Sequence, residues 1–230
     1  MNTSAIDWTA AGDSLGSRGF ALLPGILCAP ECESLIALYA NLDLFRSRID
    51  MARFRFGRGE YQYFRYPLPP LIERLRQELY PQLSPIANRW AQTLGTEDLP
   101  TNLDELTALC HRRGQQRPTP LLLHYKTGDY NCLHQDVYGE TTFPLQVVVF
   151  LSEPETDYTG GEFLLTEQIP RAQSMGRVLR PRQGDAVVIT TRYRPTQGKR
   201  GAYRVNVRHG VSEVTGGERW TLGIIFHDAE

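Results

Sequence analysis

Residues 119–152, TPLLLHYKTGDYNCLHQDVYGETTFPLQVVVFLS, decide the fold of this chain. The stretch contains three strand-like runs, PLLLHY, GDYNCLH and FPLQVVVFLS, which are rich in leucine, valine and aromatic residues. Short runs of this kind, bounded by Gly, Asp and Pro, are typical of antiparallel β-strands. The stretch therefore predicts a β-sheet, and the same pattern continues toward the C-terminus.

The part of the chain after residue 152 adds more strand-like runs. They are GGEFLL, RVLRP, GDAVVIT, YRVNVRHGVS and RWTLGIIF. Many short β segments punctuated by Gly and Pro indicate an antiparallel sandwich or barrel. The sequence therefore predicts a double-stranded β-helix, or jelly roll, over residues 119–230.

Residues 1–118 are mostly helical in pattern and include a basic, aromatic segment. A short strand is expected within 15–27. Helices are expected over 32–43 after Pro30, over 70–80 and 84–95 with Pro81 and Pro85 between them, and over 102–113 after a Thr101 cap. The prediction is an α+β fold with one domain, residues 1–230, in which the jelly roll packs against N-terminal helices.

The composition is that of an ordinary globular protein, with 41% hydrophobic residues, 22% charged residues and a net charge of −1. No apolar run approaches the roughly 20 residues of a membrane span. The N-terminus lacks a basic region followed by an apolar core, so we expect a cytoplasmic protein with no membrane partner. The four cysteines form no CxxC motif and are expected to be free thiols.

Three residues have the types and spacing of a metal site. His134 and Asp136 stand at i and i+2 in a strand-like run, so their side chains share a face. His209 lies 73 residues after Asp136 in another strand-like run. Two histidines and one carboxylate, with open coordination positions, are the ligands of non-haem Fe(II) oxygenases. The alternative is a chance HxD triplet.

The other histidines fit a metal site less well. His111 lies at a polar helix end, His227 is expected on the surface, and His124 is expected to be packed or to support the site from behind. Arg219 follows His209 by ten residues and is the cation that a second, anionic ligand requires. Its alternative is a solvated charge at a strand edge.

The stretch from about residue 120 to 228 resembles the Fe(II)/2-oxoglutarate-dependent dioxygenase superfamily, in its prolyl-hydroxylase-like branch. The matching parts are a strand region from Tyr125 to Tyr130, the HxD motif, GGEF at 160–163, GDAVV at 184–188, His209 and Arg219. The whole chain also looks like a prokaryotic family of 2-oxoglutarate oxygenases proposed to act on damaged nucleic acid.

The resemblance implies a role for each matching residue. Fe(II) is bound by His134, Asp136 and His209. Arg219 pairs with the distal carboxylate of 2-oxoglutarate. Tyr125 hydrogen-bonds this co-substrate, with plain core packing as the alternative, and Thr221 assists from the same strand face as Arg219. The implied reaction uses O₂ to hydroxylate a C–H bond and releases succinate and CO₂, with ascorbate as a candidate reductant.

The substrate is indicated by residues 45–67, FRSRIDMARFRFGRGEYQYFRYP, where arginines alternate with aromatic residues. Arginine for phosphates and aromatic rings for bases is typical of nucleic-acid surfaces. A second basic region, a loop over 192–204, precedes the distal histidine. The alternative for 45–67 is a strand pair whose arginine stems cover a core.

Two other functions stay open at this stage. The ten-residue interval between His209 and Arg219 favours a protein hydroxylase of the prolyl type. A non-catalytic jelly-roll module that binds nucleic acid or a metabolite is the alternative from another class.

Overall fold

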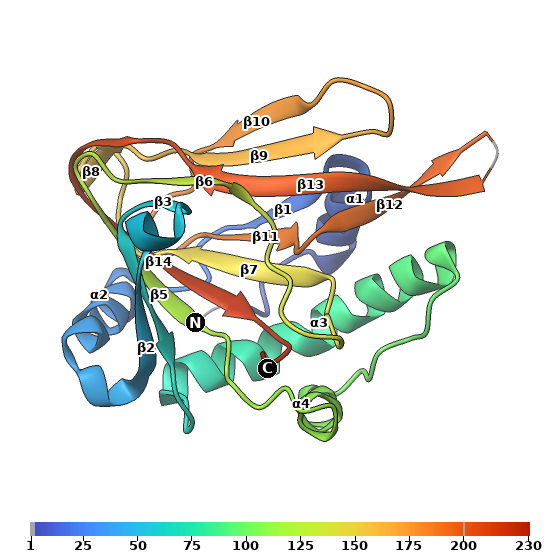
Figure 1. The fold of residues 1–230 in the computed structure, drawn as a ribbon, viewed down its shortest axis with the longest axis horizontal. Coiled ribbons are helices and arrows are strands. Elements are labelled where there is room, and N and C mark those ends of the chain that lie inside the picture. Colours follow the sequence, from blue (N-terminus) through green and yellow to red (C-terminus); the bar gives the residue numbers. More distant parts are fainter. Residues whose placement is uncertain (1–2, 200) are drawn as a thin grey trace.

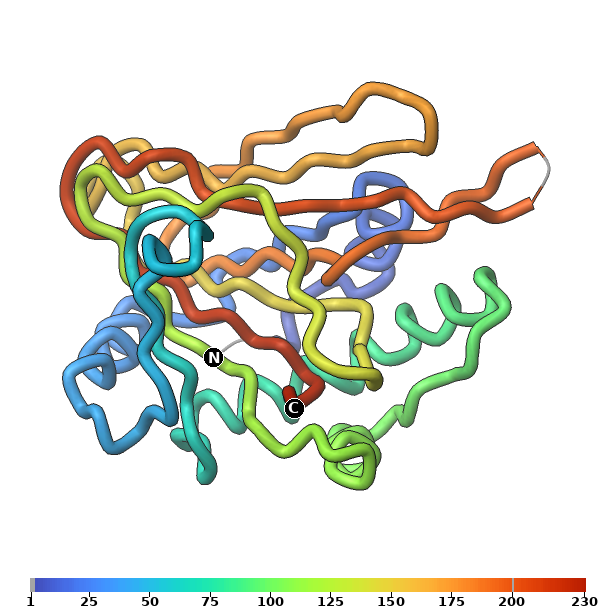
Figure 2. Tube along the Cα trace, in the orientation of Figure 1, coloured from blue at the N-terminus to red at the C-terminus, as the bar shows by residue number. Residues whose placement is uncertain are grey.

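The computed structural model describes residues 3–199 and 201–230, which form two facing β-sheets with helices on one side (Figures 1 and 2). Among these residues the larger sheet has eight strands and the smaller has six. The larger sheet has the order β1 (Phe20–Leu23), β11 (Ala186–Thr190), β7 (Leu145–Phe150), β14 (Val214–Ile225), β5 (Leu121–Lys126), β4 (Glu60–Phe64) and β2 (Phe45–Asp50), and β8 (Tyr158–Gly160) pairs with β14. This is the predicted jelly roll.

The smaller sheet lies at the top of the molecule in the view of Figure 1. Its order is β10 (Met175–Leu179), β9 (Phe163–Gln168), β13 (Gly201–Val211), β6 (Tyr130–His134) and β3 (Gly57–Arg58), and β12 (Tyr193–Gly198) pairs with β13. The helices are α1 (Trp8–Arg18), α2 (Ala29–Ala37), α3 (Pro70–Leu94) and α4 (Leu103–Arg112), with 3₁₀ turns η1 (Leu38–Ala40), η2 (Leu42–Leu44) and η3 (Met51–Phe54).

Strand alternation divides the core into two layers. Val187 and Ile189 of β11 point between the sheets, where they meet Leu165 of β9 and Val207 of β13. Their neighbour Val188 points the other way, into the layer beneath α3. Each fully buried side chain of this size contributes about 1.5–3 kcal/mol. At the β5, β6 and β14 end, the space between the sheets also contains polar residues, among them His134, His209 and Arg219.

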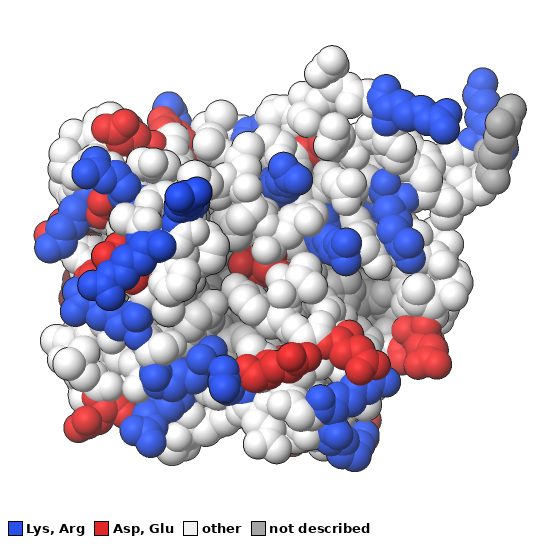
Figure 3. All heavy atoms as spheres, in the orientation of Figure 1, with Lys and Arg blue, Asp and Glu red and all other residues white. Residues whose placement is uncertain are grey.

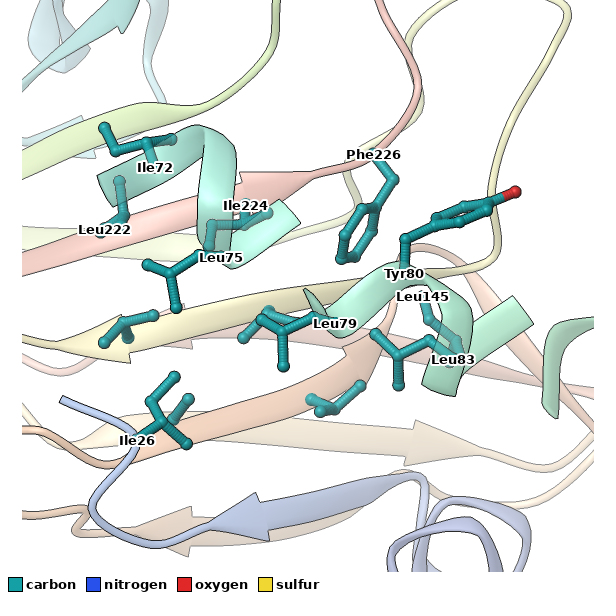
Figure 4. Close-up of a cluster of buried hydrophobic side chains, with 14 of the residues drawn as sticks. Ile26, Ile72, Leu75, Leu79, Tyr80, Leu83, Leu145, Leu222, Ile224 and Phe226 are labelled. Carbon is teal, nitrogen blue, oxygen red and sulfur yellow. The ribbon is translucent and has the colours of Figure 1, made fainter. Parts of the chain in front are cut away.

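Helix α3 covers the outer face of the larger sheet. Figure 4 shows Leu75 and Leu79 of α3 against Leu222 and Ile224 of β14, all fully buried. The predicted break at Pro81 and Pro85 is wrong, because α3 runs through both prolines. Both prolines are exposed, so their rings avoid the sheet, and the buried face continues past them.

The first 118 residues contribute strands as well as helices. β2 and β4 extend the larger sheet beyond β5, with Glu60 opposite His124. Residues 45–50 and 60–64 therefore form the strand pair that the alternative for this segment expected, and the description of residues 1–118 as mostly helical was incomplete. The cap of α4 is Asn102, whose Oδ1 accepts from the Asp104 amide (2.8 Å), rather than Thr101.

The predicted loop over 192–204 is wrong, because β12 and β13 form a long hairpin there. Arg194 is 7% exposed and donates through Nε to Glu167 on β9 (2.5 Å) and through Nη1 to the Gly16 carbonyl at α1 (2.8 Å). These partners lie far away in the sequence, so no local pattern indicates them. No helix within the described residues is long and apolar enough to cross a membrane.

Candidate active site

The three predicted metal ligands lie together between the two sheets. His134 ends β6 and stands directly opposite His209 of β13, with ring centroids 4.3 Å apart. Asp136, just after β6, places Oδ2 3.1 Å from Nε2 of His209 and Oδ1 3.5 Å from Nε2 of His134. One ligand atom from each residue falls within 4.8 Å of the other two. The spacing in the sequence predicted this cluster.

Hydrogen bonds set the protonation states of the cluster. Nδ1 of His134 lies 2.8 Å from the Cys132 carbonyl and donates to it, which leaves the Nε2 lone pair facing Asp136. Burial raises the pKa of Asp136, but hydrogen bonds from His209 and Gln146 outweigh it and hold that pKa well below its usual range. Burial lowers the pKa of His134. A carboxylate such as Asp136 and a neutral imidazole such as that of His134 are the forms that bind metals.

Two residues that sequence reasoning missed hold the carboxylate in place. Tyr138 donates to Oδ1 of Asp136 (3.0 Å), and Nε2 of Gln146 donates to Oδ2 (3.0 Å). Gln146 is 3% exposed and comes from the otherwise apolar run LQVVVF. A single polar residue in an otherwise apolar strand was the feature of the sequence that could have indicated Gln146 as a site residue. Tyr138 lies in a connecting segment and had no such feature.

Replacing Tyr138 with Phe, or Gln146 with Leu, is expected to weaken Mn(II) binding by about 10- to 100-fold. Each change removes one hydrogen bond to the carboxylate, so Asp136 is less firmly oriented toward the metal. The measurement is calorimetric titration with Mn(II). Tyr66→Phe is the matched control, since its hydroxyl binds Asp228 outside the cavity. If both variants bound Mn(II) with the wild-type affinity, the proposed role of Tyr138 and Gln146 in orienting Asp136 would be contradicted.

A cavity of about 350 Å³ contains the cluster and continues to Arg219. The Arg219 side chain is 1% exposed, and none of its three nitrogens has a hydrogen-bond partner within the described part of the chain. Its guanidinium carbon lies 5.5 Å from the Tyr125 ring centroid and 5.3 Å from that of Phe150. A buried cation without an anion costs free energy, so this end of the cavity is built for an anionic group.

The structure explains why the GGEF motif has a glycine at position 161. Gly161 has φ +59°, and a Cβ there would lie 2.9 Å from Cδ of Arg219. The glycine therefore leaves room for the arginine stem. The alternative of a solvated strand-edge charge at Arg219 is wrong, because the side chain is buried.

Tyr125 and Thr221 both line the same cavity as Arg219. Tyr125 of β5 stands directly opposite Arg219 of β14, and its hydroxyl accepts from Nδ2 of Asn131 (3.2 Å). Burial raises the pKa of Tyr125 to about 12, so the hydroxyl stays protonated and can donate a hydrogen bond. Thr221 is 2% exposed, on the same face two residues further along β14. Asn131 was not predicted.

The remaining histidines lie outside the cluster. His124 is buried on the opposite face of β5 and stacks on Trp220 (3.6 Å, 8°), which fits its prediction as a packed residue. His111 lies in the last turn of α4, with Nε2 2.9 Å from Oδ2 of Asp228. The surface prediction for His227 is wrong, because this residue is fully buried.

His227 should make the stability depend on pH. Its Nδ1 accepts from the Phe143 amide (3.1 Å), and burial lowers its pKa from 6.5 to about 4. Stability from the neutral ring is complete above pH 6.5 and is lost as the pH falls toward 4. The loss is about 3 kcal/mol in full. Urea unfolding of His227→Asn, which keeps an acceptor but does not titrate, should show a flatter profile; an equally steep one would contradict this.

The basic, aromatic segment reaches this cavity. Arg55, Phe56, Tyr61 and Tyr63 contribute to its wall. On the face in Figure 3, Lys and Arg side chains lie over β2 and β3, with some Asp and Glu among them, and again over β12 and β13, and a row of acidic side chains lies below the mostly uncharged surface between them. The two predicted basic regions therefore flank the site.

Solved structures share this fold. A prolyl-4-hydroxylase of Pseudomonas putida has a TM-score of 0.59 and 19% identity, covering 97% of this chain and 99% of its own. A prolyl hydroxylase of Trichoplax adhaerens, solved with a hypoxia-inducible-factor peptide fragment, has a TM-score of 0.58 and 14% identity, covering 96% and 89%. The fold is that of the 2-oxoglutarate/Fe(II) oxygenases, a class of oxidoreductases.

The sequence comparisons define the family more closely. Residues 59–229 match the Oxygenase-NA family, described as "Oxygenase, catalysing oxidative methylation of damaged DNA", and the chain belongs to this family. It is also 56% identical over 167 residues to uncharacterised proteins of two Mycobacterium tuberculosis strains, CDC 1551 and H37Rv, covering 72% of each chain. The predicted superfamily is confirmed, and an enzyme is favoured over a non-catalytic module.

Proposed function

We propose that the protein is an Fe(II)- and 2-oxoglutarate-dependent dioxygenase that hydroxylates a methyl C–H bond on damaged nucleic acid. The observation that carries the co-substrate assignment is Arg219, a buried cation without a hydrogen-bond partner among the described residues. It shares one cavity with the His134, Asp136 and His209 cluster. A 2-oxo acid with a distal carboxylate has one end for a metal and another for a guanidinium, and so fits both.

Each residue has a defined task in this proposal. The two imidazoles and the carboxylate would hold Fe(II) and leave positions open for ligands. Arg219 would donate hydrogen bonds to the distal carboxylate of 2-oxoglutarate, and the Tyr125 hydroxyl would donate a hydrogen bond to the same molecule. The bound iron would activate O₂, so that one oxygen atom enters the substrate C–H bond and the other enters succinate as CO₂ leaves.

The nucleic-acid substrate rests on the family description and on charge. The family is described by an action on damaged DNA. The net charge is −1, so attraction to a polyanion must be local, and the basic areas on both sides of the cavity provide it. A hydroxylated N-methyl group breaks its bond to nitrogen and leaves as formaldehyde, which returns the unmodified base.

A prolyl-type protein hydroxylase is the second candidate. The fold shared with prolyl hydroxylases and the ten-residue interval from His209 to Arg219 favour it. The same basic surface would then bind an acidic peptide.

The test is succinate formation from 2-oxoglutarate, with Fe(II) and ascorbate, in the presence of different substrates. We expect succinate and formaldehyde in equal amounts with a methylated single-stranded oligonucleotide, and little with the unmodified strand. A proline-containing acidic peptide that gains the mass of one oxygen would support the second candidate instead. No succinate with any substrate would contradict both.

A further inference from the structure

The turn between β2 and β3 exposes two phenylalanines beside the cavity. Phe54 is 54% exposed and Phe56 49%, and their rings stack on each other with centroids 5.6 Å apart and an interplanar angle of 19°. We call this pair the aromatic platform. Large apolar side chains grouped on a surface mark a site of interaction.

The aromatic platform is held firmly by the backbone around it. Met51 is fully buried beneath the turn, and its carbonyl accepts from the Phe56 amide (3.1 Å). The Phe56 carbonyl in turn accepts from the Cys132 amide (2.8 Å) on β6, two residues before His134. In Figure 1 this turn lies beside β6. The platform therefore has a fixed position relative to the metal cluster.

The two rings stand at different depths. Phe56 belongs to the cavity wall together with Arg55, whereas Phe54 does not. The platform thus extends from the cavity outward over the surface. A ligand that enters the cavity with one unit of a chain would lay the next unit over these rings.

The charge around the platform fits a polyanion. Arg55 and Arg58 are exposed and form no ion pair with any residue that the structure describes. Arg53 pairs only loosely with Asp50 (3.5 Å), and its side chain is 80% exposed. Phosphates beside stacked aromatic rings are the features of a single nucleic-acid strand.

We propose that Phe54 and Phe56 stack on an unpaired base next to the one in the cavity, so that the enzyme acts on single-stranded nucleic acid. In a duplex the faces of each base are covered by its neighbours, so they cannot reach such a platform. The cavity also has to hold the co-substrate, so we expect a single base in it. This inference rests on the proposed function.

The experiment compares two labelled strands by fluorescence anisotropy: oligothymidylate and an abasic strand of the same length and charge. The wild-type protein, with Mn(II) and 2-oxoglutarate, should bind oligothymidylate about 10- to 100-fold more tightly than the abasic strand. The double variant Phe54→Leu, Phe56→Leu keeps apolar side chains but loses the π faces, so this ratio should fall several-fold, to the part that the base in the cavity contributes. Val178→Ala, at a residue 60% exposed on β10, is the control and should keep the wild-type ratio.

An unchanged ratio in the double variant would overturn the inference, as would tighter wild-type binding to duplex than to single strand. Phe54→Leu alone is the second variant if the double variant unfolds, because Phe54 lies outside the cavity wall. It should lower the ratio by itself. The proposed function is tested separately by titrating 2-oxoglutarate into the wild-type protein with Mn(II). Failure to bind 2-oxoglutarate would contradict the proposed function, whatever the strand affinities.

Discussion

Asp136→Ala is expected to reduce Fe(II)-dependent succinate formation by more than about 100-fold, beyond what loss of a residue that only supports a metal ligand costs. The carboxylate is the one anionic member of the cluster, and its oxygens lie 3.1 Å and 3.5 Å from the two imidazole nitrogens. Without it, two neutral histidines would have to hold a divalent cation alone. Both metal affinity and turnover should therefore fall.

The same loss is expected for His134→Ala and His209→Ala, because each would supply one of the three proposed ligand atoms. His111→Gln is the matched control, since this histidine lies at the end of α4 and pairs with Asp228 outside the cavity. Co(II) binding, followed by its visible absorption, separates loss of metal from loss of chemistry. Full succinate formation by His209→Ala would show that the ligand assignment is wrong.

The ligand cluster could be predicted because it depends on strand geometry. Side chains at i and i+2 on a strand face the same way, and a jelly roll brings β6 beside β13, which puts His134 opposite His209. Arg219 and Thr221 share a face of β14 for the same reason. The alternation is visible in the sequence, whereas the pairing of β6 with β13 follows only from the jelly-roll topology.

What the sequence could not show depends on distant partners. The hairpin of β12 and β13 is stabilised by Arg194, which pairs with Glu167 of β9. Helix α3 continues through Pro81 because its buried face has a sheet to pack on. In both places local signals for a loop or a helix end are outweighed by tertiary contacts. Tyr138 is similar, since only the folded chain brings it to the carboxylate.

The charged residues at the two ends of the cavity differ in how many polar partners they have. Asp136 has four polar groups within hydrogen-bond or ion-pair distance, from both histidines, Tyr138 and Gln146. No side-chain nitrogen of Arg219 has a hydrogen-bond partner in the described structure, and the rings of Tyr125, Phe150 and Tyr158 lie 5.3–5.8 Å from its guanidinium carbon. Preorganised donors of this kind are aimed at a ligand and are stabilising only once it binds.

Arg219→Met is therefore expected to have opposite effects on stability and on co-substrate binding. Removing a buried cation with no hydrogen-bond partner should raise the free energy of unfolding without co-substrate by about 1–3 kcal/mol. The rings of Tyr125, Phe150 and Tyr158 lie 5.3–5.8 Å from the guanidinium and recover some energy. Such cation–π contacts are worth about 0.5–2 kcal/mol, whereas burying an ion costs several kcal/mol, so the gain should win.

Co-substrate binding should change the other way. Truncating one partner of a buried charge pair costs about 2–5 kcal/mol, which corresponds to roughly a 30-fold to several-thousand-fold weaker affinity for 2-oxoglutarate. Arg219→Lys keeps the charge but loses the planar guanidinium group. Its affinity for 2-oxoglutarate should therefore lie between those of the wild-type protein and Arg219→Met. Urea unfolding without ligand and thermal unfolding with Mn(II) and 2-oxoglutarate measure the two effects. The ligands should stabilise the wild-type protein far more than Arg219→Met. If Arg219→Met were less stable without ligand and equally stabilised by 2-oxoglutarate, the arginine would serve the fold instead of the co-substrate.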